Sequence, residues 1–425
     1  MATNTFSPYV GGLVRSIEAF TSEFRRRGHR VLVVAPAYPG SPKKEAGVVR
    51  IPSIRRFNGS DFSIGLPIPG FLYHALEDFR PEIVHSHHPY VLGDMALRIS
   101  ASRNIPLVFT HHTMYEMMAH YVVGDSPAMR RFVVELSTGY ANLCDRVIAP
   151  SGSTARILRE RGVTAPIGVI PTGVNPERFR RGDRDGFRAE MGIPAGAFVV
   201  GHVGRLGPEK NLGFLVQAVT GFLAVHRTAR FLVVGAGPSE AEIRDRFERC
   251  GMTGRLHYAG VLRDGKLADA YHAMDVFAFS SRNETQGMVL TEAMASGVPV
   301  VAVDAPGVRE AVEDGRNGFL LSEMSLPAFT DALLRASRLP PADFHRMREA
   351  ARETSLRYSI HRCAEDALRL YENVLEERSR GRVARIKPWA RRIGQERMLW
   401  RNRALAAVAA LSSRRGMEDA GAAVR

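Results

Sequence analysis

The stretch DVFAFSSRNETQGMVLTEAMASG, residues 275–297, decides the fold class of this chain. Its apolar run at 276–279 is typical of a buried strand, and a polar loop follows at 281–286. From residue 288 apolar side chains recur at helical spacing, and Gly297 stands where such a helix would end. A strand, a loop and a helix in this order direct the free N–H groups of the helix start toward an anion.

Two carboxylates frame the start of this helix: Glu284 lies in the loop and Glu292 a little over one turn into the helix. A carboxylate repels a phosphate, so these side chains are better suited to accept hydrogen bonds from sugar hydroxyls. Either residue alone would be interpreted as a helix cap or a solvated surface group. The pair has the spacing E-x7-E and precedes A-x-A-x-G-x-P-V-V, which favours the functional interpretation.

This pattern resembles the retaining nucleotide-sugar glycosyltransferases of family 4, which have the GT-B fold. The resemblance implies that Glu284 is a catalytic-site residue near the donor sugar and that Glu292 holds the ribose of the donor. It also implies that amides at the helix start face the donor diphosphate, those of Gln286, Gly287, Met288 and Val289. The family commonly has Pro or Gly between the first Glu and the Gly before the helix, whereas this chain has Thr285-Gln286.

A second signal follows the apolar run at 198–203, which is typical of a strand that ends in the turn GRLGPEKN, residues 204–211. Arg205 offers a forked donor and Lys210 a mobile charge, so together they are suited to clamp a diphosphate. Two unrelated surface cations would be the plainer interpretation, but the glycine turn and the position after a strand favour the clamp. The family places the same pair on the donor pyrophosphate.

The N-terminus carries a third part of the family pattern, P-x-x-G-G, which ends at Gly11 and Gly12. Adjacent glycines before a helix allow the backbone to approach a phosphate or sugar closely, and we assign both to donor binding. Only Met1 and Ala2 stand where the family has an apolar first strand. We expect the true start of the chain to lie upstream, because a central parallel strand is costly to lose.

Five histidines lie where two predicted strands end, the strands at 83–85 and 107–110. Ligands of parallel sheets bind beyond the carboxyl ends of the strands, so both clusters are expected near the site. A metal site is the weaker interpretation, because neither cluster contains a Cys or a carboxylate and His111 and His112 are adjacent. His112, followed by Thr113, matches the family residue that contacts the donor sugar and is the second catalytic candidate.

The longer strings H-S-H-H-P-Y-x-x-G and H-T-M-Y-E are similar to bacterial enzymes that glucosylate diacylglycerol. That resemblance implies an acceptor-side group in the first domain, made of His87, His88, Tyr115 and Glu116 beside His112. The alternative for each histidine is a structural residue at a strand end, which we prefer for His85. Farther along, Glu310 is in position to cap a helix, and we assign it no chemistry.

With 425 residues, of which 45% are hydrophobic and 24% charged, the chain is long enough for two globular domains. Its three cysteines are far apart and include no C-x-x-C, so neither a disulfide framework nor a zinc knuckle is indicated. The sequence shows no apolar signal segment and no stretch of the roughly 20 apolar residues that a membrane span needs. We therefore expect a cytoplasmic protein.

The net charge of +14 is concentrated at the C-terminus, where residues 378–425 hold 13 Lys or Arg against 3 Asp or Glu. The rest holds 45 against 41, which argues against a nucleic-acid groove through the core. In the tail, apolar residues fall near one helical face and arginines lie around it; these apolar residues are Trp389, Ile393, Trp400, Ala404, Val408 and Leu411. Such a helix suits an anionic membrane surface, and a disordered or partner-docked extension is the equal alternative.

Strands that alternate with helices predict an α/β fold of two doubly wound, Rossmann-like domains. The resemblance implies that they face each other across a cleft, as in the GT-B fold, with a basic C-terminal helical tail. We place the domain boundaries as follows: an acceptor-side domain at 1–175, a nucleotide-sugar domain at 176–358 that opens with a linker at 176–195, a helix crossing back onto the first domain at 359–378, and a basic amphipathic tail at 379–425.

The resemblance implies a retaining transferase that moves a hexose from a nucleoside-diphosphate sugar, of the UDP-glucose type, to a lipid such as diacylglycerol. We expect it to work on the inner face of the membrane, with residues 380–425 against the anionic lipid surface. No obligatory metal or other cofactor is expected. Three rivals remain open: a polysaccharide or polyprenyl-linked acceptor, a nucleotide-sugar epimerase of the same fold, and a binding module without activity.

Overall fold

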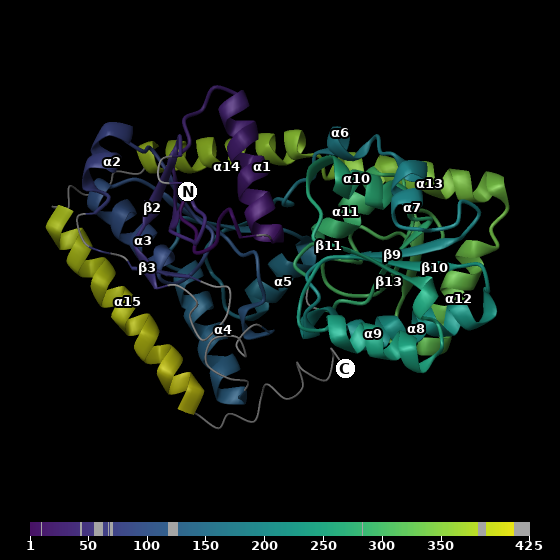
Figure 1. Ribbon diagram of the computed structural model, residues 1–425. Helices are drawn as coiled ribbons and strands as arrows, with labels where there is room; N and C mark the ends of the chain where they lie inside the picture. The colour runs from purple at the N-terminus through teal and green to yellow at the C-terminus, as the bar shows by residue number, and fades with distance from the viewer. Residues whose placement is uncertain are drawn as a thin grey trace.

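Two α/β domains lie side by side in the computed structural model, with the first half of the chain in one and most of the second half in the other (Figure 1). The structure describes residues 1–9, 11–42, 45–54, 63–66, 68, 71–117, 126–282, 284–380 and 388–411, without the side chains of residues 64 and 388–392. The parts of the predicted tail at 381–387 and 412–425, and the side chain of Trp389, therefore lie outside the described residues.

The second domain is built on a six-stranded parallel sheet with the order β11-β10-β9-β12-β13-β14. These strands are β9 (Val199–Val203), β10 (Arg230–Val234), β11 (Leu256–Gly260), β12 (Val276–Phe279), β13 (Val300–Val303) and β14 (Gly318–Leu321). Side chains along each strand alternate between two cores: Phe277 and Phe279 pack on one face of the sheet, Val276 and Ala278 on the other. The sheet is thus buried on both faces, as a near-continuous apolar strand predicts.

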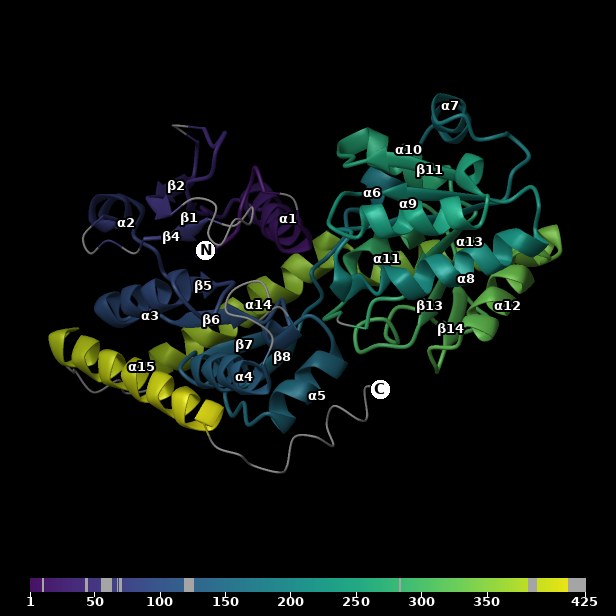
Figure 2. The ribbon, with the colours of Figure 1, turned by 60° about the horizontal axis from the view of Figure 1, so that its bottom comes forward.

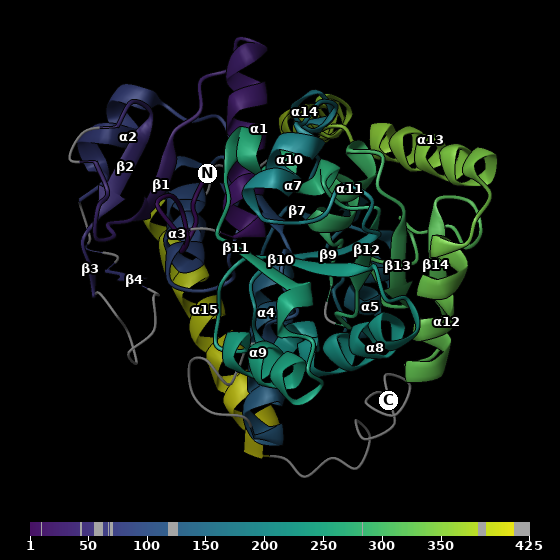
Figure 3. The same cartoon turned by 45° about the vertical axis from the view of Figure 1, so that its right-hand side comes forward.

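Helices cover both faces of this sheet, and Figure 3 shows them on either side of the strands. One face packs against α10 (Asp264–His272), α11 (Met288–Ala295) and α13 (Pro341–Arg357), and the other against α8 (Leu212–Val225), α9 (Glu240–Arg249) and α12 (Leu326–Ser337). This arrangement confirms the predicted doubly wound α/β fold.

The stretch predicted as a linker is instead helical and belongs to the second domain. It forms α6 (Pro176–Phe179) and α7 (Arg184–Glu190), with Phe179 and Phe187 buried in the same core as β12. The Arg188 guanidinium, 1% exposed, pairs with Asp275 at 2.9 Å. The prediction of a linker was wrong because Phe179 and Phe187 are buried in the second-domain core and Arg184 and Arg188 both pair with Asp275.

The first domain has a parallel sheet with the order β5-β6-β7-β8 and a separate parallel pair, β1 and β2. These strands are β1 (Val33–Pro36), β2 (Val48–Ile51), β5 (Val84–Ser86), β6 (Leu107–Thr110), β7 (Arg146–Ala149) and β8 (Ile167–Val169), with a short antiparallel pair β3 (Ser53–Ile54) and β4 (Ile64–Gly65) outside them. Ala2 bridges β1 and β5 in parallel, with its N–H donating to His85 and its carbonyl accepting from His87. Residues 1–3 therefore occupy the place between β1 and β5 where a first strand was expected.

The helices of the first domain are α1 (Gly12–Arg26), α2 (Tyr73–Phe79), α3 (Leu92–Arg103), α4 (Pro127–Ala141) and α5 (Gly152–Glu160). The long helix α14 (Ile360–Arg380) follows α13 but packs on this domain, where Cys363, Ala367 and Tyr371 join a core with Phe24 and Val108. The Tyr371 hydroxyl lies 2.6 Å from Nδ1 of His85.

The last described helix, α15 (Pro388–Leu411), lies along α3 and α4 (Figures 1 and 2). Polar contacts hold it there: Asn402 donates to the Leu136 carbonyl at 3.0 Å, and Arg403 pairs with Asp94 at 2.5 Å. The large apolar side chains of Trp400 and Leu411 face outward, 66% and 88% exposed. Among the described residues, no helix combines the length and apolarity that crossing a bilayer requires.

Candidate active site

A cleft of about 780 Å³ lies between the two domains and is lined by residues of both. The structure brings together in its wall every residue predicted for catalysis or donor binding: Gly11, Gly12, His112, Arg205, Lys210, Glu284, Gln286, Gly287, Met288, Val289 and Glu292. The carboxyl ends of β9 and β12 and the start of α11 supply most of the second-domain wall, and the start of α1 and the loop after β6 supply part of the facing wall.

The turn into α11 presents backbone N–H groups to the cleft. Gly287 is the N-cap residue of α11 and has φ 77°, in the left-handed region that favours glycine. A Cβ at this position would also lie 2.9 Å from the Leu290 side chain. The first amides of a helix have no intrahelical acceptor, so this turn can donate to an anion in the cleft.

Charged side chains in the cleft are paired with one another. The Lys210 ammonium lies 2.5 Å from Glu284 Oε1, and both side chains are mostly buried. Arg205 lies in the turn after β9 and is 3.4 Å from Glu209. A diphosphate entering the cleft would therefore meet two cations and compete with carboxylates for them.

Glu292 is held from both domains. Its carboxylate, 4% exposed, accepts from Arg15 at 2.9 Å and from the Tyr271 hydroxyl at 2.8 Å. The Glu292 charge raises the pKa of the Arg15 guanidinium. Sequence reasoning missed Arg15, although its position one helical turn after Gly11-Gly12 was a usable signal.

His112 is tied to both domains by two different groups. Its Nε2 lies 2.9 Å from Nδ1 of His87, and its carbonyl accepts from the Thr285 hydroxyl at 2.8 Å. Burial holds the pKa values of both imidazoles well below the ordinary value of 6.5, so the pair is neutral. One neutral ring must donate to the other, so the tautomers of the two rings are coupled and the His112 ring is held in its orientation.

The residues predicted for the acceptor side are not among those that line the cleft, and their role stays a prediction. His87, His88 and Tyr115 are 1%, 8% and 5% exposed and lie behind the cleft wall. Glu116 pairs with Arg161 at 2.5 Å. The His87 and Tyr115 rings pack against His112 and His111, and His88 Nδ1 accepts from the Asn4 N–H. Within the described ranges, no three His, Cys, Asp or Glu side chains are grouped so as to hold a metal ion.

Further contacts across the domain boundary were not predicted from the sequence. The Gln286 side-chain oxygen accepts from the Thr172 N–H and hydroxyl, each at 2.5 Å. The Glu310 carboxylate accepts from the N–H groups of Gly152 and Ser153. Glu310 does cap a helix, but that helix belongs to the other domain.

Comparison with protein families finds two matches that together span most of the chain. The model described as Glycosyltransferase Family 4 matches residues 10–178, and Glycosyl transferases group 1 matches residues 197–338.

Similar curated proteins act on different substrates. A GDP-mannose-dependent alpha-mannosyltransferase of Mycobacterium tuberculosis is 33% identical over 76% of this chain and 82% of its own length. An alpha-monoglucosyldiacylglycerol synthase of Streptococcus pneumoniae is 27% identical over 75% of this chain and 74% of its own length.

Solved structures of two further proteins share the fold. Sucrose-phosphate synthase from Thermosynechococcus elongatus superposes with a TM-score of 0.71, at 20% identity over 88% of this chain and 99% of that one. Anabaena HepE in complex with UDP and glucose gives 0.69, at 20% identity over 87% of this chain and 98% of that one. The two matching family models and a relative 33% identical over three quarters of the chain lead to one conclusion: this protein belongs to the retaining glycosyltransferases of family 4, with the GT-B fold, and is a hexosyltransferase.

Proposed function

We propose that the protein transfers a hexose from a nucleoside-diphosphate sugar of the UDP-glucose type to a lipid acceptor such as diacylglycerol. One observation supports the donor half of this proposal: Arg205, Lys210 and the amide-bearing turn at Gly287 line the same cleft as Glu284 and Glu292. Diacylglycerol as acceptor is supported by the names of relatives from Streptococcus pneumoniae and Acholeplasma laidlawii, both alpha-monoglucosyldiacylglycerol synthases.

In the proposed reaction the donor diphosphate displaces Glu284 from Lys210, and Glu292 accepts from the ribose hydroxyls. Negative charge builds on the diphosphate as the glycosidic bond lengthens, and Arg205, Lys210 and the α11 amides stabilise it. Once displaced from Lys210, Glu284 can accept hydrogen bonds from hydroxyls of the sugar, which also lies beside His112. The acceptor hydroxyl enters on the face from which the diphosphate leaves and gives its proton to it, so retention of configuration needs no protein nucleophile and no metal.

The outward face of α15 supports a second part of the proposal, that the protein works from the cytoplasm on the inner face of a membrane. Polar side chains of α15 and the buried Leu399 pack on the first domain, whereas Trp400 and Val408 are exposed, together with Arg397 and Arg401. Apolar and cationic side chains on one helical face are the combination that binds an anionic lipid surface.

The test of the reaction is product analysis with radiolabelled donors. The purified protein is given UDP-glucose or GDP-mannose together with one acceptor at a time: diacylglycerol or polyprenyl phosphate in vesicles of anionic phospholipid, or a soluble glycan. Glu284→Gln serves as the inactive control. A labelled glycolipid formed from UDP-glucose supports the proposal. Label transferred only from GDP-mannose would contradict the proposed donor, and label transferred only to polyprenyl phosphate or a glycan would contradict the proposed acceptor. Epimerised sugar nucleotide without transfer would indicate the epimerase. No turnover would indicate a binding module without activity.

The test of the membrane contact is vesicle sedimentation with matched variants. Val408→Glu on α15 and Val225→Glu at the end of α8 make the same change at positions of similar exposure, 64% and 58%. We expect Val408→Glu to weaken binding to anionic vesicles severalfold and Val225→Glu to leave it unchanged. Equal binding by both variants would show that α15 does not contact the lipid.

A further inference from the structure

One short segment of the second domain supports the loop that carries Glu284. The Gly307 N–H donates to the Glu284 carbonyl at 3.0 Å. A Cβ on Gly307 would lie 2.5 Å from the backbone nitrogen of Gln286, so only glycine permits this approach. The loop at 284–287 and the segment at 305–310 are therefore held together as one unit.

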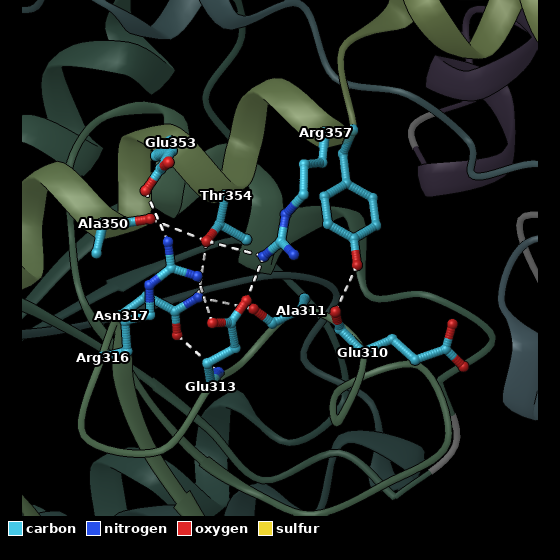
Figure 4. A network of polar contacts seen from close by, with 10 residues as sticks. Glu310, Ala311, Glu313, Arg316, Asn317, Ala350, Glu353, Thr354 and Arg357 are labelled. Carbon is cyan, nitrogen blue, oxygen red and sulfur yellow. Dashed lines mark hydrogen bonds and ion pairs between the residues drawn. The ribbon is translucent and has the colours of Figure 1, made fainter.

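The end of this segment is fixed on α13, as Figure 4 shows. The Tyr358 hydroxyl donates to the Glu310 carbonyl at 2.7 Å. The fully buried Asn317 donates to the Ala311 carbonyl at 2.9 Å and to the Thr354 hydroxyl at 3.0 Å. The backbone on both sides of Glu310 is thus anchored, while its carboxylate points away from the rest of this network.

That carboxylate reaches the first domain and caps α5. It accepts from the Gly152 N–H at 2.8 Å and the Ser153 N–H at 2.6 Å, the first two residues of the helix. The Ser151 hydroxyl accepts from the Thr154 N–H, the next amide along. A helix start carries unpaired N–H groups and a positive potential. A carboxylate placed there both accepts hydrogen bonds from these groups and is attracted by the potential.

The capped helix also contacts the catalytic loop, because the Thr154 hydroxyl donates to the Thr285 carbonyl at 3.2 Å. Thr285 in turn donates to the carbonyl of His112, in the first domain. The Glu284 loop is therefore connected to the first domain directly, through Thr285 and through the Gln286–Thr172 contact, and indirectly, through the segment that ends at Glu310.

We propose that Glu310 is an interdomain positioning residue that clamps α5 to the unit carrying Glu284. The clamp sets the separation across the cleft at which His112 and Glu284 contact the donor sugar. Its effect on transfer rests on the proposed function of the cleft, whereas the clamp itself is a property of the fold. The groups proposed to bind the nucleotide diphosphate, Arg205, Lys210 and the α11 amides, all lie in the second domain and do not depend on it.

The test compares Glu310→Ala and Glu310→Gln with Glu353→Gln. Glutamine keeps the shape of Glu310 but can accept only one of the two N–H groups, so it remains informative if the alanine variant folds poorly. Glu353 belongs to the same network through Arg316, at 2.7 Å, and its carboxylate makes its contact within the second domain, which makes it the matched control.

Hydrogen exchange at the amides of Gly152 and Ser153 reports directly on the clamp, since the helix itself provides no acceptor for them. We expect exchange there to be at least tenfold faster in Glu310→Ala, intermediate in Glu310→Gln and unchanged in Glu353→Gln. We also expect kcat for sugar transfer to fall at least tenfold in Glu310→Ala, while the affinities for UDP and GDP stay within threefold of wild type.

Unchanged exchange at Gly152 and Ser153 in both Glu310 variants would overturn the proposal, and so would an equal loss of kcat in Glu353→Gln. A parallel fall in kcat and in nucleotide affinity would also overturn it, since the clamp would then act on the donor site itself. If wild type bound neither UDP nor GDP, the proposed function would fail, and the exchange measurement would still decide whether the clamp exists.

Discussion

Replacing Lys210 by Met removes the ammonium that pairs with Glu284 at 2.5 Å in a mostly buried setting. When the donor binds, Nζ exchanges one carboxylate for a diphosphate oxygen, so affinity depends on the difference between two charge-assisted hydrogen bonds. Such a bond contributes about 1.5–3 kcal/mol, and we expect a net loss of about 1–2 kcal/mol, or about five- to thirtyfold in donor affinity. In the transition state the diphosphate gains charge, so we expect kcat to fall further, by about 10²-fold.

Calorimetric titration with UDP and GDP measures the first effect, and initial rates with the radiolabelled donor measure the second. Lys266→Met is the matched control, because Lys266 pairs with Glu190 on the exposed surface outside the cleft. Lys210→Arg, which keeps the charge, should recover part of the affinity. Affinity and kcat that both stay within twofold of wild type in Lys210→Met would refute the inference that Lys210 contacts the diphosphate.

Three further outcomes follow from the same contacts. Glu292→Gln should reduce the preference for a ribose donor over its 2′-deoxy analogue by about tenfold, because a full carboxylate accepts more strongly from the hydroxyl pair; a preference unchanged in competition assays would contradict this. Arg15→Met should lower the free energy of unfolding by about 1–3 kcal/mol, since it leaves the buried Glu292 carboxylate without its cation, and adding Glu292→Gln should restore part of the loss in urea denaturation; a double variant no more stable than the single one would argue against the pair. Burial lowers the pKa of His85 to about 3, so the folded protein keeps this ring neutral while the unfolded chain protonates it below about pH 6.5. Stability should therefore be complete above pH 6.5 and fall by about 1.4 kcal/mol per pH unit for each such histidine as the pH drops toward 3, and equal urea midpoints at pH 7.5 and pH 5 would rule this out.

Local sequence determined the two α/β domains and most of the cleft. A few neighbouring residues are enough to specify a buried strand, a glycine turn or a helix start. The carboxyl ends of parallel strands then meet at one edge of a sheet. Glu284, Gly287 and Lys210 could therefore be placed in one site from their spacing and from the strands they follow. The resemblance to family 4 added their roles, which remain predictions.

The tertiary structure alone decided how the two domains meet. Arg15 and Glu292 are 277 residues apart, and Glu310 lies 158 residues from Gly152, so no local pattern could pair them. The same holds for α15. Its amphipathic pattern does not say which face docks, because that depends on the surface it meets. Here α3 and α4 present Asp94 and the Leu136 carbonyl, so the face of α15 with Asn402, Arg403 and Leu399 packs inward, and the face with Trp400, Val408 and Leu411 stays exposed.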